Sequence, residues 1–285
     1  MNWTSRRQRM RALLAGKTCV FPASVFDPVS ARIAADIGFE LGMYAGSTAS
    51  MTVLGAPDLI LLTLTEFAAQ ALRINRAVEL PVIADADHGY GNALNVMRTV
   101  QELETAGIAA MTIEDTLLPR AFGEDKARPV SIAEGVGKMK AAVAAREDPD
   151  LVILARTGAI AMTGLADTLE RVRAYSATGV DGVFIAGART RAEVDALRAA
   201  TPLPLVLGTL TPEIADRDFL SSRGVPVALQ GHAPIMAAAE AVRKTMQALR
   251  DGIEPGKLEG LPSDAFVKKV TRDGDAARAI DAFLR

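Results

Sequence analysis

The chain has 285 residues and a net charge of −2, with 32 Lys and Arg against 34 Asp and Glu. This balance argues against a nucleic-acid partner, which requires a strong basic excess. A hydrophobic content of 49% with 23% charged residues is typical of a globular core. The single cysteine, Cys19, excludes an internal disulfide and a cysteine-based zinc site, and we expect it to be a core residue. The two histidines, His88 and His232, are too few for a polyhistidine metal site.

The beginning of the chain predicts an amphipathic helix that ends at Gly16. Its apolar stretch, Ala12–Ala15, is too short for the hydrophobic region of a signal sequence. The longest apolar run, Leu59–Leu64, is far shorter than the ~20 residues that span a bilayer. We therefore expect a cytoplasmic protein with no membrane partner.

Short runs rich in Val and Ile alternate with Ala-, Leu- and Arg-rich stretches, the pattern of βα units around a parallel sheet. Eight units favour an α/β fold, a (β/α)8 TIM-type barrel, over an open doubly wound sheet, which usually has fewer strands in this length. The predicted strands are Cys19–Phe21, Leu41–Ala45, Val82–Ala86, Ala110–Ile113, Leu151–Ala155, Gly182–Ile185, Leu205–Leu207 and Val227–Leu229.

The stretches between these runs predict helices. Ser131, three residues before Glu134, indicates one helix start, and Asp167 indicates another. Glycines between a helical stretch and a strand predict left-handed helix ends at Gly38, Gly107, Gly179 and Gly224. The predicted helices include Asn92–Ala106, Ile132–Ala145, Asp167–Thr178, Arg191–Ala200 and Ile235–Leu249.

Residues 1–250 are predicted to form the barrel, and residues 251–285 a C-terminal helical extension. The extension opens with glycines and prolines and continues with a helical pattern. Because it lies beyond the eighth unit, it is either a cap on the barrel or an arm that packs on a neighbouring subunit.

Polar side chains follow several of the predicted strands. In (β/α)8 barrels the chemistry is built at the carboxyl ends of the strands, which meet at one mouth. The second strand is followed by Ser47, and the third ends with Asp85 and Asp87. The fourth is followed by Glu114, the fifth by Arg156 and the eighth by His232.

The densest signal is the sequence Asp85-Ala86-Asp87. Alternate residues of a strand share a face, so the two carboxylates point the same way and repel each other unless a cation intervenes. Mg²⁺ takes oxygen ligands, keeps several waters and needs only one or two carboxylates. Glu114 could add an oxygen through water. The alternative is an acidic strand end that faces solvent or an arginine.

Three further side chains are candidates for contact with an acidic substrate. Arg156 offers a fork for a carboxylate, or alternatively forms an ion pair with Glu114 or Asp85. His232 is either a donor or acid at the mouth, or a capping or core histidine. Ser47 offers a hydroxyl to a carboxylate oxygen.

Ser47, Asp58, the stretch Asp85–Asn92, Glu114-Asp115 and Ala155–Thr157 together resemble the isocitrate lyase and phosphoenolpyruvate mutase superfamily. The resemblance runs from about Phe21 to Pro234. The stretches that look most like the oxaloacetate decarboxylase branch are Ala23–Asp27, Thr112–Thr116 and Gln230–Ala233.

The resemblance implies a modified barrel, often a homotetramer, whose last helix can be exchanged between subunits. It implies Mg²⁺, with Mn²⁺ as an alternative, held directly by Asp85. The same resemblance places Asp58, Asp87 and Glu114 around the ion through water. The substrate contacts that it implies are Ser47, Arg156 and His232, the last two being the catalytic candidates.

The sequence departs from parts of the superfamily pattern. Carbon–carbon lyases carry a Lys-Lys-Cys-Gly-His-type segment after the fourth strand, and Leu117–Lys126 has neither cysteine nor histidine. Phosphonate mutases place an asparagine in this gating loop, and none occurs between Glu114 and Pro129. Differences from the expected pattern that bear on the substrate are Gly158, Ile160 and Thr209.

These features predict Mg²⁺-dependent decarboxylation of oxaloacetate, a 2-keto dicarboxylate, to pyruvate and CO₂ through a metal-stabilised enolate. Arg156 would neutralise a substrate carboxylate, Ser47 would orient the α-keto carboxylate, and His232 would hydrogen-bond the keto oxygen or a carboxylate. The segment Leu117–Arg128, with Gly123 as its hinge, would close over the site. Two alternatives stay open: a carbon–carbon lyase that acts on a 2-substituted malate or a related acid, and a non-catalytic dicarboxylate-binding barrel.

Overall fold

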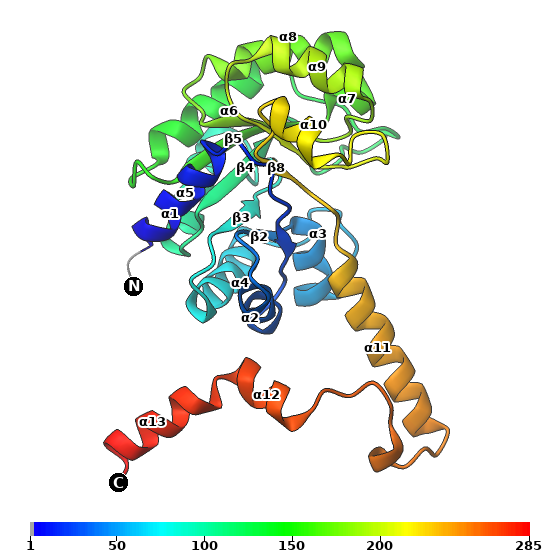
Figure 1. Ribbon diagram of the computed structural model, residues 1–285. Coiled ribbons are helices and arrows are strands. Elements are labelled where there is room, and N and C mark those ends of the chain that lie inside the picture. The colour runs from blue at the N-terminus through cyan, green and yellow to red at the C-terminus, as the bar shows by residue number, and fades with distance from the viewer. Residues whose placement is uncertain (1–2) are drawn as a thin grey trace.

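The computed structural model describes residues 3–285 (Figure 1), so Met1 and Asn2 of the predicted barrel domain lie outside the described part. Eight parallel strands pair in chain order. Val20 also pairs in parallel with Val227 of the last strand, so the sheet curls until its two edges meet. The predicted (β/α)8 barrel is confirmed. Its strands are β1 (Ala23–Ser24), β2 (Gly42–Tyr44), β3 (Val82–Asp85), β4 (Ala110–Glu114), β5 (Val152–Thr157), β6 (Gly182–Ile185), β7 (Leu205–Leu207) and β8 (Val227–Ala228).

The prediction of the first strand at Cys19–Phe21 was wrong. Only Val20 pairs with β8, and the chain then passes Pro22, which has no N–H to donate, before β1 pairs with β2. The strand therefore lies at Ala23–Ser24. Cys19 precedes it and is fully buried, as expected of a core residue.

Helices cover the outside of the barrel (Figure 1). Side chains of Asp27, Thr63, Asn92 and Thr190 accept backbone N–H groups in capping boxes. The bounds are α1 (Thr4–Leu14), α2 (Pro28–Ile37), α3 (Gly46–Ala49), the π-helix η1 (Ser50–Leu54), α4 (Leu64–Ala77), α5 (Ala93–Thr105), α6 (Ile132–Ala145), α7 (Ala159–Met162), α8 (Leu165–Ser176), α9 (Arg191–Ala200), α10 (Arg217–Ser222), α11 (Ala233–Arg250), the 3₁₀ helix η2 (Pro255–Lys257), α12 (Asp264–Thr271) and α13 (Asp273–Phe283).

One predicted helix start and four predicted helix ends can be compared with the structure. Asp167 does not start α8, which begins at Leu165 after Gly164; Asp167 lies in the first turn and accepts hydrogen bonds from Thr163 and Arg171. The left-handed glycines are confirmed, since all four have positive φ: Gly38 (97°), Gly107 (84°), Gly179 (92°) and Gly224 (64°).

The inside of the barrel is filled from both strands and the N-terminal helix. Strand side chains such as Ile83, Leu154 and Val206 pack with Met10 and Leu14 of α1 in one buried cluster. Arg7 of α1 is buried and forms an ion pair with Asp148 at 2.7 Å. The amino-terminal end of the barrel is thus plugged, which leaves the carboxyl-terminal mouth for a site.

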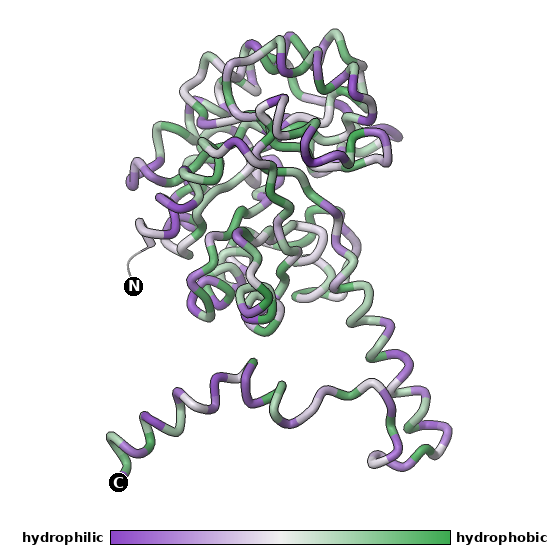
Figure 2. Tube along the Cα trace, in the orientation of Figure 1, coloured by the Kyte–Doolittle hydropathy of each residue, from purple (hydrophilic) through white to green (hydrophobic). Residues whose placement is uncertain are grey.

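The helix that follows the eighth strand, α11, does not pack along the barrel but projects away from it (Figure 1). Its one buried residue is Ile235. Apolar and polar residues alternate along its exposed length (Figure 2). The chain then returns so that α12 contacts α2, where Val270 is buried and Arg272 forms an ion pair with Asp36 at 2.8 Å.

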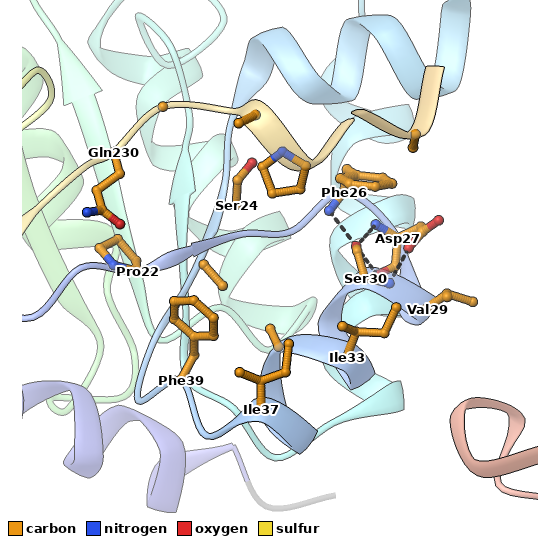
Figure 3. Close-up of a pocket in the computed structure, with 16 residues that line it drawn as sticks. Pro22, Ser24, Phe26, Asp27, Val29, Ser30, Ile33, Ile37, Phe39 and Gln230 are labelled. Atoms are coloured by element: carbon orange, nitrogen blue, oxygen red, sulfur yellow. Dashed lines mark hydrogen bonds between the residues drawn. The ribbon is translucent and has the colours of Figure 1, made fainter. Parts of the chain in front are cut away.

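A cavity of about 510 Å³ lies beside β1, between α2 and the start of α11 (Figure 3). Its walls are mainly apolar side chains, among them Val29, Ile33, Ile37 and Phe39. Among residues 3–285, none of the helices combines the length and the apolar character that a bilayer crossing demands.

Two left-handed glycines give a matched test of the packing around α1. At Gly38 an added Cβ would meet nothing within 4 Å, whereas at Gly107 it would lie 2.7 Å from the Trp3 ring. We expect Gly38→Ala to lower the free energy of unfolding by about 1–2 kcal/mol, the cost of a left-handed alanine. Gly107→Ala should lower it further, because Trp3 must also move. Urea unfolding of both variants checks this; equal losses would contradict the packing of Trp3 against Gly107.

Candidate active site

The strand register brings three charged residues to neighbouring strand ends at the carboxyl-terminal mouth. Asp85 is the last residue of β3, and Glu114, the last residue of β4, stands opposite Arg156 of β5. Arg156 forms an ion pair with Asp85 and a second, at 3.1 Å between Nε and Oε2, with Glu114. One guanidinium therefore lies between two carboxylates.

Asp87 joins this group from the turn after β3. It adopts a left-handed conformation, with φ of 47°, which is uncommon for a residue other than glycine and occurs often at functional sites. A Cβ on Gly46 would lie 2.9 Å from both Asp87 carboxylate oxygens. Glycine at position 46 therefore lets the carboxylate sit against the backbone that enters α3.

Two further donors, besides Arg156, fix the orientation of Asp85. The Thr112 hydroxyl donates to Asp85 Oδ1 at 3.0 Å, and the backbone N–H of Asp87 donates to the same oxygen at 3.3 Å. Sequence analysis missed Thr112, although its place two residues before Glu114 in the same strand puts both on one face. That alternation was the signal that could have found it.

Three carboxylates of this site, those of Asp58, Asp87 and Glu114, have raised pKa values. Burial, and then the charges of Asp85 and Glu114, raise the pKa of Asp87 well above its usual value. Burial also raises the pKa of Glu114, against the opposing effect of Arg156. At the more exposed rim, burial and Asp85 raise the pKa of Asp58. Four carboxylates thus face a single guanidinium, and the site has an excess of negative charge.

The four carboxylates fit a hard divalent cation, because the atoms that they offer as metal ligands are oxygens and the site has an excess of negative charge. Within residues 3–285, no three Asp, Glu, His or Cys side chains form a group that could hold an ion together. Mg²⁺ commonly keeps several of its waters and binds only one or two carboxylates directly. Asp85, whose carboxylate is oriented by Thr112, is the best placed for such a direct contact.

His232 reaches the same mouth from the segment after β8. Its Nδ1 lies 2.8 Å from the hydroxyl oxygen of Ser24, the last residue of β1. Burial lowers the pKa of His232, while the charges of Asp85 and Asp58 act in the opposite direction. The lowered pKa favours the neutral form of the imidazole. Ser24 was not among the predicted site residues, because β1 was placed too early in the chain.

The remaining candidates are less tightly held. Ser47 lies in the first turn of α3, directly after Gly46, and is partly buried. His88 contributes through its backbone, since its carbonyl accepts a hydrogen bond from Lys138 Nζ at 2.8 Å. Burial and Lys138 lower the pKa of the His88 side chain to about 4. Ile160 packs against the buried cluster that includes Val183 and Ile185, and it lies beside Gly187.

A second cavity, of about 360 Å³, lies between the carboxylates of Asp58, Asp87 and Glu114 and the loop after β4, which forms part of its wall. The stem of this loop is closed by pairing of Thr116 with Pro129, and its tip carries Phe122, which is fully exposed. Gly123 has φ of 81°. The residues that line the cavity are Asp58, Leu59, Ile60, Asp87, Glu114, Thr116, Leu118, Pro119, Arg120 and Arg156.

A buried network holds the base of this loop. Arg171 Nη1 lies 3.0 Å from Asp115 Oδ2, and the Tyr175 hydroxyl donates to the same oxygen at 2.7 Å. Arg171 also donates to the carbonyl of Val130 at 2.9 Å, and the Val130 N–H donates to the Asp115 carbonyl at 2.7 Å. Both ends of the loop are therefore tied to α8 next to Glu114.

Comparison with known proteins places the chain among related enzymes. Residues 10–250 match the family model described as phosphoenolpyruvate phosphomutase. The chain is 55% identical over 284 residues to a protein named oxaloacetate decarboxylase from Rhodopseudomonas palustris (strain BisA53), covering 100% of this chain and 98% of that one. It is 56% identical over 282 residues to a protein of the same name from Bradyrhizobium diazoefficiens, covering 99% and 98%.

A solved structure shows the same fold with a metal. Phosphonopyruvate hydrolase in complex with oxalate and Mg²⁺ superposes with a TM-score of 0.87 at 32% identity, covering 98% of this chain and 99% of that chain.

The network around Asp115 can be tested by removing its cation. Arg171→Ala would leave the fully buried Asp115 carboxylate without a charge partner, and we expect the free energy of unfolding to fall by about 3–5 kcal/mol. Arg173→Ala, on the exposed face of the same helix, should change it by less than about 0.5 kcal/mol. Urea unfolding compares the two, and a similar small loss for both would refute a structural role for the ion pair.

Proposed function

The chain belongs to the phosphoenolpyruvate phosphomutase family, within the superfamily that also holds isocitrate lyase, and on this premise we propose that it decarboxylates oxaloacetate to pyruvate and CO₂. It is an enzyme of the carboxy-lyase class. The relatives named oxaloacetate decarboxylase match it over almost their whole length at about 55% identity.

The observation that carries the proposal is the set of charges at the mouth. The half-buried guanidinium of Arg156 is held by Asp85 and Glu114 and borders the 360 Å³ cavity, so its remaining N–H groups can meet a substrate carboxylate there. The same cavity offers space for a cation beside Asp87 and Glu114. The one cysteine of the chain, Cys19, is buried in the outer core and lies in another part of the fold. The reaction supported best is therefore one that needs neither a cysteine acid nor a covalent nucleophile.

Mg²⁺ is the proposed cofactor, with Mn²⁺ as a possible substitute because it prefers similar oxygen ligands. Asp85 would bind the ion directly, and the carboxylates that would act through water are Asp58, Asp87 and Glu114. When bound, such an ion supplies Lewis acidity toward an α-keto acid. The excess of carboxylates over cationic groups supports this assignment, as do the raised pKa values of Asp58, Asp87 and Glu114.

The protein side chains bind and orient the 2-keto dicarboxylate. Arg156 pairs with a substrate carboxylate through two N–H groups, and Ser47 offers its hydroxyl to the α-keto carboxylate. The neutral His232 donates a hydrogen bond to the keto oxygen. The bond between C3 and C4 then breaks and CO₂ leaves. Its electron pair forms the C2–C3 double bond, and negative charge moves to the keto oxygen, where a fixed donor stabilises it most. A proton from water added at C3 then converts the enolate to pyruvate. Closure of Leu117–Arg128 would exclude water.

Two other functions remain as outcomes of the test. A lyase acting on a 2-substituted malate would share the metal site but needs an acid that Leu117–Lys126 does not contain. A non-catalytic dicarboxylate-binding barrel would bind oxalate with Mg²⁺ and turn over nothing. We also propose a cytoplasmic location, in keeping with a fold that uses no disulfide.

The homotetramer is proposed from the position of α11. In a (β/α)8 barrel the eighth helix packs on the outside of the sheet, whereas α11 leaves the barrel and a cavity lies beside β1 (Figure 3). Met246 and Val242 of α11 are 66% and 52% exposed. We propose that α11 and the parts of the extension 251–285 outside the contact between α12 and α2 pack on a neighbouring copy of the barrel domain, which covers these apolar surfaces in an assembly of four.

Pyruvate release from oxaloacetate tests the activity, with Mg²⁺ or EDTA and with the metal-catalysed background subtracted. We expect EDTA and Asp85→Ala to reduce release to background. Arg156→Ala should lower kcat/KM by about 100-fold or more, since two charged hydrogen bonds are lost at about 1.5–3 kcal/mol each. Arg173→Ala serves as the matched control. Pyruvate release by Asp85→Ala at the wild-type rate would contradict the metal assignment. If the wild type releases no pyruvate, the lyase on a substituted malate and the non-catalytic binding barrel are the functions that are left.

Light scattering after gel filtration tests the assembly. A Val242→Glu, Met246→Glu double variant would bury two charges in the proposed interface, so its mass should fall below that of the wild-type tetramer. Lys244→Ala, on the same exposed helix, should keep the tetramer. A monomeric wild type, or a tetramer of the double variant, would argue against packing of α11 between subunits.

A further inference from the structure

The imidazole of His232 is held by a residue from the opposite end of the chain. His232 immediately precedes α11, and its side chain makes no capping bond to that helix. Most of α11 is exposed, so the helix itself gives the ring little support. Among the hydrogen bonds described for residues 3–285, the one that the imidazole makes is with Ser24, at 2.8 Å.

The hydroxyl of Ser24 has few hydrogen-bond acceptors within reach. A serine hydroxyl can donate once and accept twice, and Ser24 is 7% exposed. In the described part of the chain, the hydrogen-bond partner of its Oγ is His232 Nδ1. If Nδ1 carried a proton, the Ser24 proton would point at no acceptor, and a largely buried donor without a partner is costly. The bond is better satisfied when Ser24 donates to a bare Nδ1.

We propose that Ser24 is a positioning residue that donates its hydroxyl proton to Nδ1 of His232 and thereby holds the neutral imidazole as the Nε2–H tautomer. This inference rests on the proposed function only for its consequence, which is that His232 offers the keto oxygen of the substrate a donor. The other tautomer would offer a lone pair, which repels the charge that develops on that oxygen. A neutral imidazole donor is an established way to polarise a carbonyl.

A second serine nearby gives a matched control. Ser30 lines the same cavity as Ser24 (Figure 3), but its hydroxyl accepts the backbone N–H groups of Phe26 and Asp27 at 3.0 Å and caps α2. Loss of the Ser30 hydroxyl should affect the stability of α2 and leave His232 unchanged. Any effect that Ser24→Ala shares with Ser30→Ala is therefore one of local packing.

The tautomer can be measured directly without substrate. The chain has two histidines, so two-bond ¹H–¹⁵N spectra of ¹⁵N-histidine-labelled protein contain two imidazole patterns, and His232→Gln identifies that of His232. We expect the Nε2–H pattern for His232 in the wild type, in Ser30→Ala and in Ser24→Thr, which keeps a hydroxyl. Ser24→Ala should show a mixture of tautomers. An Nδ1–H pattern in the wild type, or an unchanged pattern in Ser24→Ala, would overturn the proposal.

Turnover of oxaloacetate tests the consequence. Ser24→Ala should lower kcat about 10-fold with little change in KM, and Ser24→Thr should restore most of it. A wild-type kcat in Ser24→Ala despite mixed tautomers would refute the role in catalysis. If the wild type does not decarboxylate oxaloacetate at all, the proposed function fails, while the spectra still decide whether Ser24 sets the tautomer. Melting curves confirm that each variant is folded.

Discussion

The mouth of the barrel depends on one electrostatic constraint, the need to hold several carboxylates close together in a partly buried place. The strand register fixes their positions, because Asp85 and Glu114 end neighbouring strands and Arg156 stands on the next. Like charges at this range raise each other's pKa and destabilise the fold unless cations balance them. Arg156 supplies one positive charge, and burial strengthens its attraction to both acids. The surplus of carboxylates is what makes a divalent cation fit the site.

Barrel closure links this site to the unusual course of the eighth helix. Val20 pairs with β8, and two residues beyond Pro22 the chain presents Ser24 to His232. The same segment forms the wall of the cavity beside β1 that α11 leaves open. His232 is thus positioned by the first strand and not by α11, the helix that it precedes. A barrel whose last helix departs needs such a contact to keep the side chain of His232 in place.

Much of this architecture is encoded locally and could be predicted from sequence. Strands β6 and β7 and helix α6 match their predicted bounds, because short apolar runs and a serine cap leave little choice. The placement of β1 failed, since a run of apolar residues does not reveal which neighbour each residue pairs with. Ser24 was missed for the same reason. The departure of α11 has no sequence signal of its own, because an amphipathic helix has the same pattern whether it covers its own barrel or another surface.

The chemistry of the leaving group explains why the loop after β4 can lack an acid. A lyase that splits a substituted malate releases two fragments, one of which leaves as a carbanion. A side-chain acid above the site protonates that carbanion. In a decarboxylation the leaving fragment is neutral CO₂, and the charge that requires stabilisation lies on the keto oxygen. The enolate can take its proton at C3 from water once the loop opens. A loop tipped by Phe122, with Arg120 facing the cavity, can therefore exclude water and attract a dicarboxylate without donating a proton. On the proposed mechanism, the demands of the reaction fall on Asp85 and Arg156 at the strand ends and on His232, which Ser24 of β1 holds.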